Sequence, residues 1–154
     1  MAASGPARLT GGCQCGAIRY EIASPRWTTV CHCRMCQKAS GQPFMVFVGG
    51  PAENLRWTRG APRFFASSDI AERGFCAACG TPLTYGRPGA ATLSVTLGSL
   101  DDPAAVQPSL QNGIEAKLGW VDALASLPAR TTADWLREAG ICSVTSRQHG
   151  GDES

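Results

Sequence analysis

The sequence predicts a single domain with a mainly β fold built from short strands. The chain has 154 residues, a length typical of one domain, and 44% of them are hydrophobic, which is enough for a core. It also contains 18 glycines and 10 prolines. Because both residues interrupt regular structure, this abundance favours many turns between short strands over long helices.

Alternating apolar and polar residues predict the positions of the strands. The alternation is clear in residues 18–23 and cleanest in residues 92–97, as expected for strands with one buried face. Residues 44–48 are apolar at every position, which predicts a strand covered on both faces. Weaker strand patterns bounded by turn-forming residues occupy 63–66, 70–75 and 83–85.

A short helix is predicted near the C-terminus, over residues 131–139. Thr131 and Asp134 have the spacing of a capping pair at its start. Gly140 suits the left-handed conformation that often ends a helix. Residues 104–129 have no clear periodicity and receive no assignment.

Composition and charge limit the kinds of partner and the cellular compartment that we expect for this protein. The net charge is only +2 and the basic residues are scattered, so neither nucleic acid nor a membrane surface is an expected partner. No apolar run approaches the roughly 18–20 residues that span a bilayer, and residues 1–9 lack the apolar core of a secretory signal. We therefore expect a cytoplasmic protein with one domain over 10–142, between flexible tails at 1–9 and 143–154.

The chain contains eight cysteines, seven of which lie in three groups. In a reducing cytosol, clustered cysteines are more often metal ligands or reactive thiols than disulfides. A disulfide framework would be the alternative if the protein were exported.

Two short cysteine pairs lie far apart in the sequence and are each followed by glycine: Cys-Gln-Cys-Gly at 13–16 and Cys-Ala-Ala-Cys-Gly at 76–80. Glycine accepts a positive φ, and the tight turn directs backbone N–H groups at the sulfurs. Four cysteines are a usual ligand set of a closed structural zinc. We predict a structural Zn²⁺ on Cys13, Cys15, Cys76 and Cys79; the alternative is four buried thiols without a metal.

A third group, Cys31, Cys33 and Cys36, lies within one short segment that we expect to be a loop. Three thiolates from one segment cover one side of a metal and leave a fourth position open, which is the pattern of a catalytic zinc. Such a zinc is a weak Lewis acid but can bind an incoming thiol as the thiolate. The sequence therefore predicts a second zinc here, with these three cysteines as ligands in a catalytic site suited to sulfur chemistry.

Other interpretations of this cluster remain open. The thiols could be free, with Cys33 or Cys36 activated by nearby basic residues. Cys33 and Cys36 could form a redox pair with Cys31 as a spare, or the cluster could bind metal only weakly. His32 could complete a closed structural shell, although we expect it to lie in the loop or behind the ligands.

Cys142, the eighth cysteine, has no second cysteine nearby. We expect it to be a small buried apolar residue that follows the helix. His149, in the C-terminal tail, is assigned no role.

The three cysteine groups and their flanking residues resemble the glutathione-dependent formaldehyde-activating enzyme family, whose domain also occurs in centromere protein V. The resemblance runs from about Gly11 to Leu100 and more loosely to Trp120. It rests on Gly-Cys-Gln-Cys-Gly-Ala-Ile-Arg-Tyr at 12–20, Cys-His-Cys-Arg-Met-Cys at 31–36, Ser-Gly at 40–41 and Phe-Cys-Ala-Ala-Cys-Gly-Thr-Pro-Leu at 75–83.

This resemblance implies a β-tent of antiparallel strands, with the four-cysteine zinc cross-linking it and the second zinc holding the thiol of glutathione. It also implies a carbon–sulfur lyase activity similar to that of S-(hydroxymethyl)glutathione synthase, acting on aldehyde adducts of glutathione or another small thiol. Arg34 and Lys38 are the cations nearest the inner cluster, and they are candidates for binding the carboxylates of glutathione.

Two other functions remain possible from the sequence. The first is a non-enzymatic zinc-containing β module that binds a macromolecule, with Trp27, Trp57 and Trp120 as surface anchors. The second is a thiol redox sensor in which Cys33 and Cys36 form a disulfide. An exchangeable fourth ligand at the inner cluster would favour the enzyme, and a fourth protein ligand would favour the module. Exposed edge strands could also support a homodimer.

Overall fold

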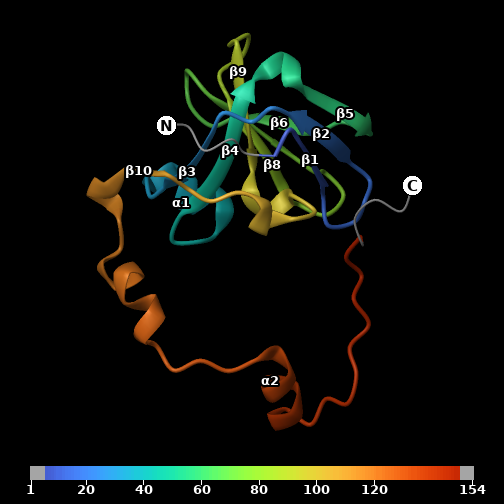
Figure 1. Cartoon of the computed structure of the whole chain (residues 1–154), viewed down its shortest axis with the longest axis vertical. Coiled ribbons are helices and arrows are strands. Elements are labelled where there is room, and N and C mark those ends of the chain that lie inside the picture. Colours follow the sequence, from blue (N-terminus) through green and yellow to red (C-terminus); the bar gives the residue numbers. More distant parts are fainter. Residues whose placement is uncertain (1–5, 150–154) are drawn as a thin grey trace.

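The strands form two sheets in the computed structural model, which describes residues 6–149 (Figure 1). The smaller sheet has three antiparallel strands in the order β1-β2-β5. Its members are β1 (Arg8–Gly12), β2 (Arg19–Ala23) and β5 (Leu55–Arg59).

The larger sheet has seven strands in the order β10-β3-β4-β9-β8-β7-β6. All its neighbours are antiparallel except β10 and β3, which run parallel. Its members are β3 (Trp27–Cys31), β4 (Met45–Pro51), β6 (Arg63–Ala66), β7 (Glu72–Phe75), β8 (Pro82–Gly86), β9 (Thr92–Thr96) and β10 (Leu110–Asn112). The predicted mainly β fold, a tent of short antiparallel strands, is therefore confirmed.

The helices are short and lie between strands or beyond them. Within residues 6–149, the α-helices are α1 (Arg34–Ser40) and α2 (Thr132–Glu138). Single-turn or slightly longer 3₁₀ helices occupy the connections: η1 (Ala52–Asn54), η2 (Leu97–Ser99), η3 (Pro103–Ala105), η4 (Ile114–Ala116) and η5 (Gly119–Ser126). No helix in the described part of the chain is long and apolar enough to cross a bilayer.

The predicted C-terminal helix is present as α2, and its start is a reciprocal capping box. The Asp134 backbone N–H donates to Thr131 Oγ1, and the Thr131 backbone N–H donates to Asp134 Oδ2, each over 3.1 Å. Gly140, just beyond the helix, has the expected positive φ of 68°. Local capping chemistry was therefore sufficient to locate this helix.

The core lies between the two sheets, where apolar side chains from both meet. Tyr20 and Ile22 of β2 contribute from the smaller sheet, and Val48, Leu83 and Val95 from the larger one, all at most 1% exposed. Burying each such side chain contributes about 1.5–3 kcal/mol. The continuous apolar run of β4 is explained by this packing, since most of its residues are buried on both faces.

An ion pair between a buried arginine and a partly exposed aspartate joins the smaller sheet to the segment that follows β9. The guanidinium of Arg19, a residue 5% exposed, donates to both carboxylate oxygens of Asp101, over 2.8 Å to Oδ1 and 2.5 Å to Oδ2. Thr10 Oγ1 donates to the same carboxylate over 2.6 Å. The hydrogen bonds from Arg19, opposed by partial burial, lower the pKa of Asp101. The carboxylate therefore stays charged and paired at neutral pH.

Next to this ion pair, the backbone of β1 lies close to the end of η2. Tyr20 Oη and Ser99 Oγ are 2.7 Å apart in the core, and Gly11 forms a β-bridge with Leu100. A Cβ atom at Gly11 would lie 2.4 Å from the Ser99 carbonyl oxygen. Only glycine permits this close approach of the two segments.

The N-terminal boundary predicted from the sequence is wrong by two residues. Arg8 and Leu9, which we expected in a flexible tail, begin β1, and Leu9 is only 6% exposed in the core. The glycines of this strand resemble a turn in sequence, but pairing with β2 fixes it as a strand. The remaining tail assignments for 1–5 and 150–154 lie outside the described residues.

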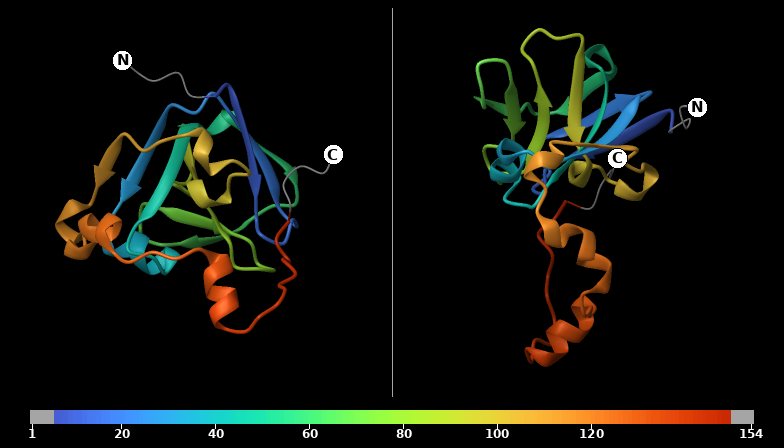
Figure 2. Two further views of the ribbon diagram at one scale, coloured as in Figure 1. Left: turned by 60° about the horizontal axis from the view of Figure 1, so that its bottom comes forward. Right: turned by 90° about the vertical axis from the view of Figure 1, so that its left-hand side faces the viewer.

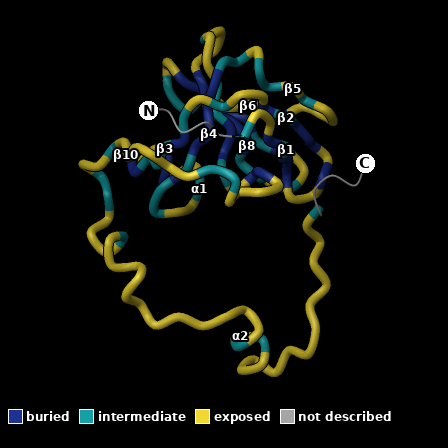
Figure 3. The backbone as a smooth tube through the Cα atoms, in the orientation of Figure 1, coloured by how far each residue is buried: buried dark blue, intermediate teal, exposed yellow. Residues whose placement is uncertain are grey.

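The segment from η5 onwards leaves the sheets and returns to them, as two further views show (Figure 2). It is exposed over most of its length (Figure 3), and α2, at its far end, has no buried residue. The segment returns where the His149 backbone N–H donates to the Gln14 carbonyl over 2.7 Å. The expectation that Cys142 is buried is wrong, since this cysteine is exposed on the excursion.

The Arg19–Asp101 pair generates a stability prediction. Asp101→Asn should lower the free energy of unfolding by about 2–3 kcal/mol, because a largely buried guanidinium loses its carboxylate. Urea denaturation at fixed zinc concentration would measure the change. The control is Asp122→Asn in the exposed Lys117–Asp122 pair, where a loss under about 0.5 kcal/mol is expected. Equal losses in the two variants would contradict the assigned role.

Candidate metal centres

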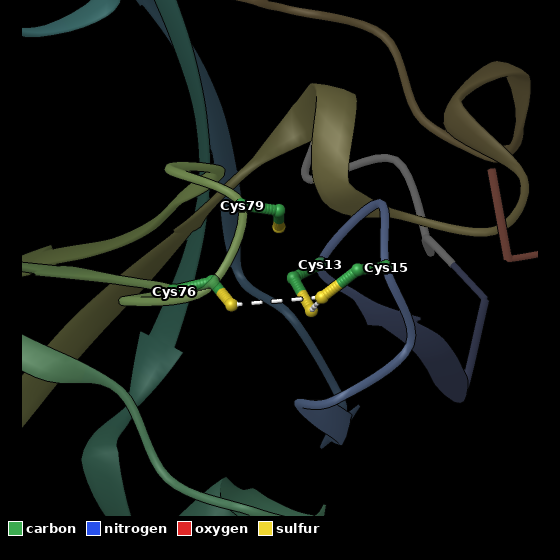
Figure 4. A group of neighbouring side chains, drawn as sticks. All are labelled: Cys13, Cys15, Cys76 and Cys79. Atoms are coloured by element: carbon green, nitrogen blue, oxygen red, sulfur yellow. Dashed lines mark hydrogen bonds between the residues drawn. The ribbon is translucent and has the colours of Figure 1, made fainter. Parts of the chain in front are cut away.

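The two distant cysteine pairs meet at one point between the sheets (Figure 4). Cys13 and Cys15 lie in the turn between β1 and β2, and Cys76 and Cys79 lie in the turn between β7 and β8. The four sulfurs all lie within 4.8 Å of one another. We call them the outer cluster. Four cysteine sulfurs so close together fit tetrahedral zinc, which favours thiolate ligands.

Both turns of the outer cluster have the geometry expected from their glycines. Gly16 and Gly80 have φ values of 76° and 77°, which residues with a Cβ atom rarely adopt. In each turn the N–H of the glycine donates to the carbonyl of the first cysteine, over 3.0 Å and 2.8 Å respectively. The two turns thus form matching hooks that each direct a pair of thiols at the same point.

Hydrogen bonds in the outer cluster favour the charged form of two sulfurs. Burial opposes ionisation of Cys13, but the Ile18 backbone N–H donates to its sulfur over 3.2 Å, and the net effect lowers its pKa. Burial also opposes ionisation of Cys79, but the Thr81 hydroxyl, 3.2 Å from its sulfur, helps to lower the pKa to about 6. Thiolates are the form that binds a metal.

The turns are also joined to each other directly. The Gln14 backbone N–H donates to Thr81 Oγ1 over 3.1 Å, and Gln14 Nε2 donates to the Cys79 carbonyl over 3.3 Å. Residues of one hook therefore hydrogen-bond the other without any metal. This contact fixes the relative position of β1–β2 and β7–β8, and with it the spacing of the four sulfurs.

The third cysteine group is formed by a strand and a helix rather than by the loop that we expected. Cys31 is the last residue of β3, Cys33 is the N-cap of α1, and Cys36 lies in its first turn. Their sulfurs lie within 4.8 Å of one another. Within residues 6–149, no fourth His, Cys, Asp or Glu ligand atom belongs to this group. We call these three residues the inner cluster.

The three inner thiols have different tendencies to ionise. Burial raises the pKa of Cys31, and it raises that of Cys36 to about 12 despite a hydrogen bond from Arg73. For Cys33, burial is outweighed by hydrogen bonds, among them the Cys36 backbone N–H at 3.4 Å, so its pKa is lowered. Of the two free-thiol candidates, these pKa shifts favour Cys33 and disfavour Cys36.

His32 lies beside the inner cluster but is engaged elsewhere. It is 1% exposed, its Nε2 is 3.0 Å from Gln111 Oε1, and its ring packs edge-on against Phe44 with centroids 5.6 Å apart. These contacts hold the imidazole among neighbouring side chains. His32 is not among the residues whose ligand atoms converge with the three sulfurs.

A hydrogen bond and a close backbone contact join the inner cluster and α1 to the segment at residues 113–116. Gln37 Nε2 donates to the His32 carbonyl over 2.7 Å and to the Ala116 carbonyl over 2.9 Å. Gly113 lies so close that a Cβ atom there would be 2.7 Å from the Cys33 nitrogen. The sequence analysis missed both residues, since a glutamine in a short helix and an isolated glycine carry no distinctive signal.

Arg73 of β7 is the most informative residue that the sequence analysis missed. It is 8% exposed, and its Nη2 donates to Cys36 Sγ over 3.4 Å. It lies in a run of Glu-Arg-Gly-Phe, where nothing distinguishes it from a surface arginine. Only the pairing of β7 with β8 places this side chain beside the inner cluster.

A cleft of about 710 Å³ adjoins the inner cluster, and this volume is within the range of small-molecule sites. Arg73 and Met45 belong to both regions, since Met45 packs against Cys36 and lines the cleft. The candidate substrate-binding residues Arg34 and Lys38 also line it. Its remaining lining is mostly apolar: Met35, Ala39, Phe65, Ser67, Gly74, Phe75, Gly80, Pro82 and Thr84.

These features define a thiol-rich β protein with two clusters able to hold a metal. Residues 8–115 match the family model described as "Glutathione-dependent formaldehyde-activating enzyme". Since this match covers most of the chain, the protein belongs to that family, and the resemblance stated from the sequence is confirmed.

Individual relatives agree with this membership. A Halomonas elongata protein named "Putative glutathione-dependent formaldehyde-activating enzyme" is 26% identical over 152 residues, covering 86% of this chain and 97% of its own length. An "uncharacterized lyase" of Schizosaccharomyces pombe is 35% identical over 77 residues, which cover 49% of this chain and 55% of that protein. The family and these names support a glutathione-related, lyase-type function.

A solved structure supports the fold. The crystal structure of a Rhodobacter sphaeroides protein superposes with a TM-score of 0.53 at 19% sequence identity. The match covers 68% of this chain and all of the other. At this identity the likeness concerns the fold alone.

The geometry of the outer cluster predicts different effects for two cysteine substitutions. Cys79→Ser should lower the zinc content by about one ion per chain and destabilise the fold by about 2–5 kcal/mol, as does loss of a cross-link closing a long loop. Cys142→Ser, at an exposed cysteine outside both clusters, should change neither quantity. Elemental analysis and urea denaturation would measure them. An unchanged zinc content in Cys79→Ser would exclude a metal at the outer cluster.

Proposed function

We propose that this protein is a zinc-dependent carbon–sulfur lyase-type enzyme that resembles S-(hydroxymethyl)glutathione synthase and acts on adducts of glutathione, or another small thiol, with an aldehyde. The observation that carries the proposal is the inner cluster: three convergent sulfurs without a fourth protein ligand among the described residues. Three protein ligands and an open position are typical of catalytic zinc sites. Family membership and the lyase names of relatives support the same class.

In this proposal Cys31, Cys33 and Cys36 hold the catalytic zinc, and the outer cluster holds a structural one. The donor set fits, since soft thiolates suit Zn²⁺. When bound at the inner cluster, zinc would supply a positive centre that stabilises a substrate thiol as its thiolate. Four thiolates at the outer cluster would leave no position for a substrate.

The cleft beside the inner cluster provides the groups that would bind the rest of the thiol. Glutathione carries two carboxylates, and Arg34 and Lys38, both exposed on α1, can supply cations to them. Arg34 Nη1 donates to Gln37 Oε1 over 2.5 Å, which orients its guanidinium and leaves other N–H groups available. Binding at these two residues would hold the substrate in the cleft whose Met45 and Arg73 contact the inner cluster.

In the proposed reaction the protein mainly has to orient the thiol and the aldehyde toward each other. The sulfur of the thiolate forms a bond to the aldehyde carbon, the C=O π bond breaks, and the oxygen takes up the proton that the thiol has lost. The product is a hydroxyalkyl thioether, and the reverse reaction regenerates thiol and aldehyde. Holding both reactants in the cleft converts their encounter into an effectively intramolecular step.

The tryptophans do not favour the alternative of a macromolecule-binding module. Trp57 packs against the core beside Tyr20, with ring centroids 5.7 Å apart, and Trp27 is half-buried against Gly49. Only Trp120 of the three is largely exposed, at 51%. One exposed side chain among these three tryptophans is a weak basis for a protein-binding surface.

The zinc content of the protein tests the inner site directly. Anaerobically purified wild-type protein should contain about two zinc ions per chain, and a Cys31→Ser, Cys33→Ser variant about one, because two of three ligands are lost. Elemental analysis would measure both. Formation of the glutathione–formaldehyde adduct, followed by NMR, should be accelerated by wild-type protein only. One zinc in both proteins would contradict the catalytic zinc.

A comparison of KM for a thiol with carboxylates and a thiol without them tests whether Lys38 binds a carboxylate of glutathione. Lys38→Ala should raise KM for glutathione roughly fivefold, which corresponds to the ~1 kcal/mol of an exposed ion pair. KM for 2-mercaptoethanol, which has no carboxylate, should not change. Lys117→Ala is the matched control, because Lys117 pairs with Asp122 and does not line the cleft. A rise of the same size for both thiols would argue against carboxylate binding by Lys38.

A further inference from the structure

A buried arginine lies against the inner cluster without a carboxylate partner. Arg73 contacts three side chains: its Nη2 donates to Cys36 Sγ over 3.4 Å and its Nη1 to Met45 Sδ over 3.7 Å, and its Cζ lies 4.7 Å from the ring centroid of Tyr85. Its Nε is buried and has no hydrogen-bond partner among the described residues. The guanidinium is therefore surrounded by sulfur atoms and an aromatic face.

The charge of Arg73 is not balanced by any carboxylate in the described part of the chain. No Asp or Glu within residues 6–149 lies within ion-pair distance of it. The other buried arginine, Arg19, pairs with Asp101 through two hydrogen bonds. A buried charge is costly unless it is paired, and neither a thioether nor a neutral thiol carries a compensating charge. The cation–π contact with Tyr85 offsets only part of this cost.

The inner cluster can supply the missing negative charge. Zinc with three thiolates carries one net negative charge, and Arg73 carries one positive charge, so the two together are neutral. Addition of a substrate thiolate would bring the zinc and its ligands to two negative charges, and Arg73 would again cancel one of them. The arginine also lines the cleft, so it borders both the sulfur of Cys36 and the space proposed for the substrate.

We propose that Arg73 is the positioning residue of the inner site: its guanidinium balances the charge of the metal-bound thiolates and fixes the sulfur of Cys36. The inference rests on the proposed zinc at Cys31, Cys33 and Cys36, but it concerns the affinity for the metal and not the identity of the substrate. Hydrogen-bonded partners of metal ligands typically change metal affinity by 10–100-fold when they are removed. Arg73 makes such a contact from a different strand, β7, and so links the site to the larger sheet.

Zinc affinity of the full-length protein, measured by competition with a chromogenic chelator, would test this role. Arg73→Gln should weaken inner-site zinc binding by at least about tenfold, while Arg73→Lys, which keeps the charge but not the planar guanidinium, should retain more of the zinc affinity than Arg73→Gln. The outer zinc should be unchanged in both. Arg63→Gln is the matched control, because Arg63 lies on the adjacent strand β6 and is exposed.

Cobalt substitution gives a second readout that a purely structural role would not change. The Co²⁺ protein should show thiolate charge-transfer absorption from the inner site, and Arg73→Gln should shift it, whereas Arg63→Gln should not. Unaltered zinc affinity and spectrum in Arg73→Gln would overturn the proposal. So would an Arg73→Lys protein as defective as Arg73→Gln, or loss of folding in both, because charge would then not be the operative property.

The role of Arg73 and the proposed enzymatic function can be contradicted separately by these experiments. Wild-type protein that binds zinc at the inner cluster but does not accelerate adduct formation would contradict the enzyme alone, since the affinities are measured without any thiol substrate. Normal activity in wild type together with an unaffected Arg73→Gln protein would contradict the role of Arg73 alone. Wild-type protein with a single zinc would overturn both.

Discussion

The convergence of two cysteine hooks at the outer cluster is the constraint on which the rest of the structure depends. One hook lies in the turn that joins β1 to β2, and the other joins β7 to β8, so their meeting fixes the smaller sheet against the larger one. The Arg19–Asp101 pair and the shared core support the same junction. Because Cys76 directly follows β7, the junction also sets the position of Arg73, three residues earlier, beside the inner cluster. Strand β7 thus connects the outer cluster to the inner one.

The ligand atoms of the inner cluster come from one short segment, whereas the residues around them come from distant parts of the chain. The three sulfurs come from one junction between β3 and α1, and the short helix gives Cys33 and Cys36 their relative placement. The surroundings come from elsewhere: Met45 from β4, Arg73 from β7, and Gly113 from the segment after β10. Local sequence therefore supplies the ligand atoms, whereas the charge, the polarity and the access of the site depend on the completed fold.

This division explains what the sequence alone could and could not predict. The cysteine groups and the capped helix α2 were recognisable because short spacings and single turns determine them. The strand β1 was missed because its two glycines resemble a turn, and α1 was missed because we expected a loop between the cysteines. Arg73 carried no signal, since only strand pairing decides that it is buried. Cys142 was placed wrongly because an apolar preference for burial requires a surface to pack against, and its segment has none.

The different sequence spans of the two clusters have a consequence for assembly. The outer cluster joins residues separated by 61 positions, whereas the inner ligands lie within a single short segment. Closing the longer loop costs an unfolded chain about 2 kcal/mol more. The inner ligand set is consequently available to a metal before the fold is complete, and a metal there would favour the folded chain only through contacts that the fold adds, such as that of Arg73 with Cys36. A metal at the outer cluster would therefore be coupled to folding more strongly than one at the inner cluster, where ligands could exchange without opening the long loop.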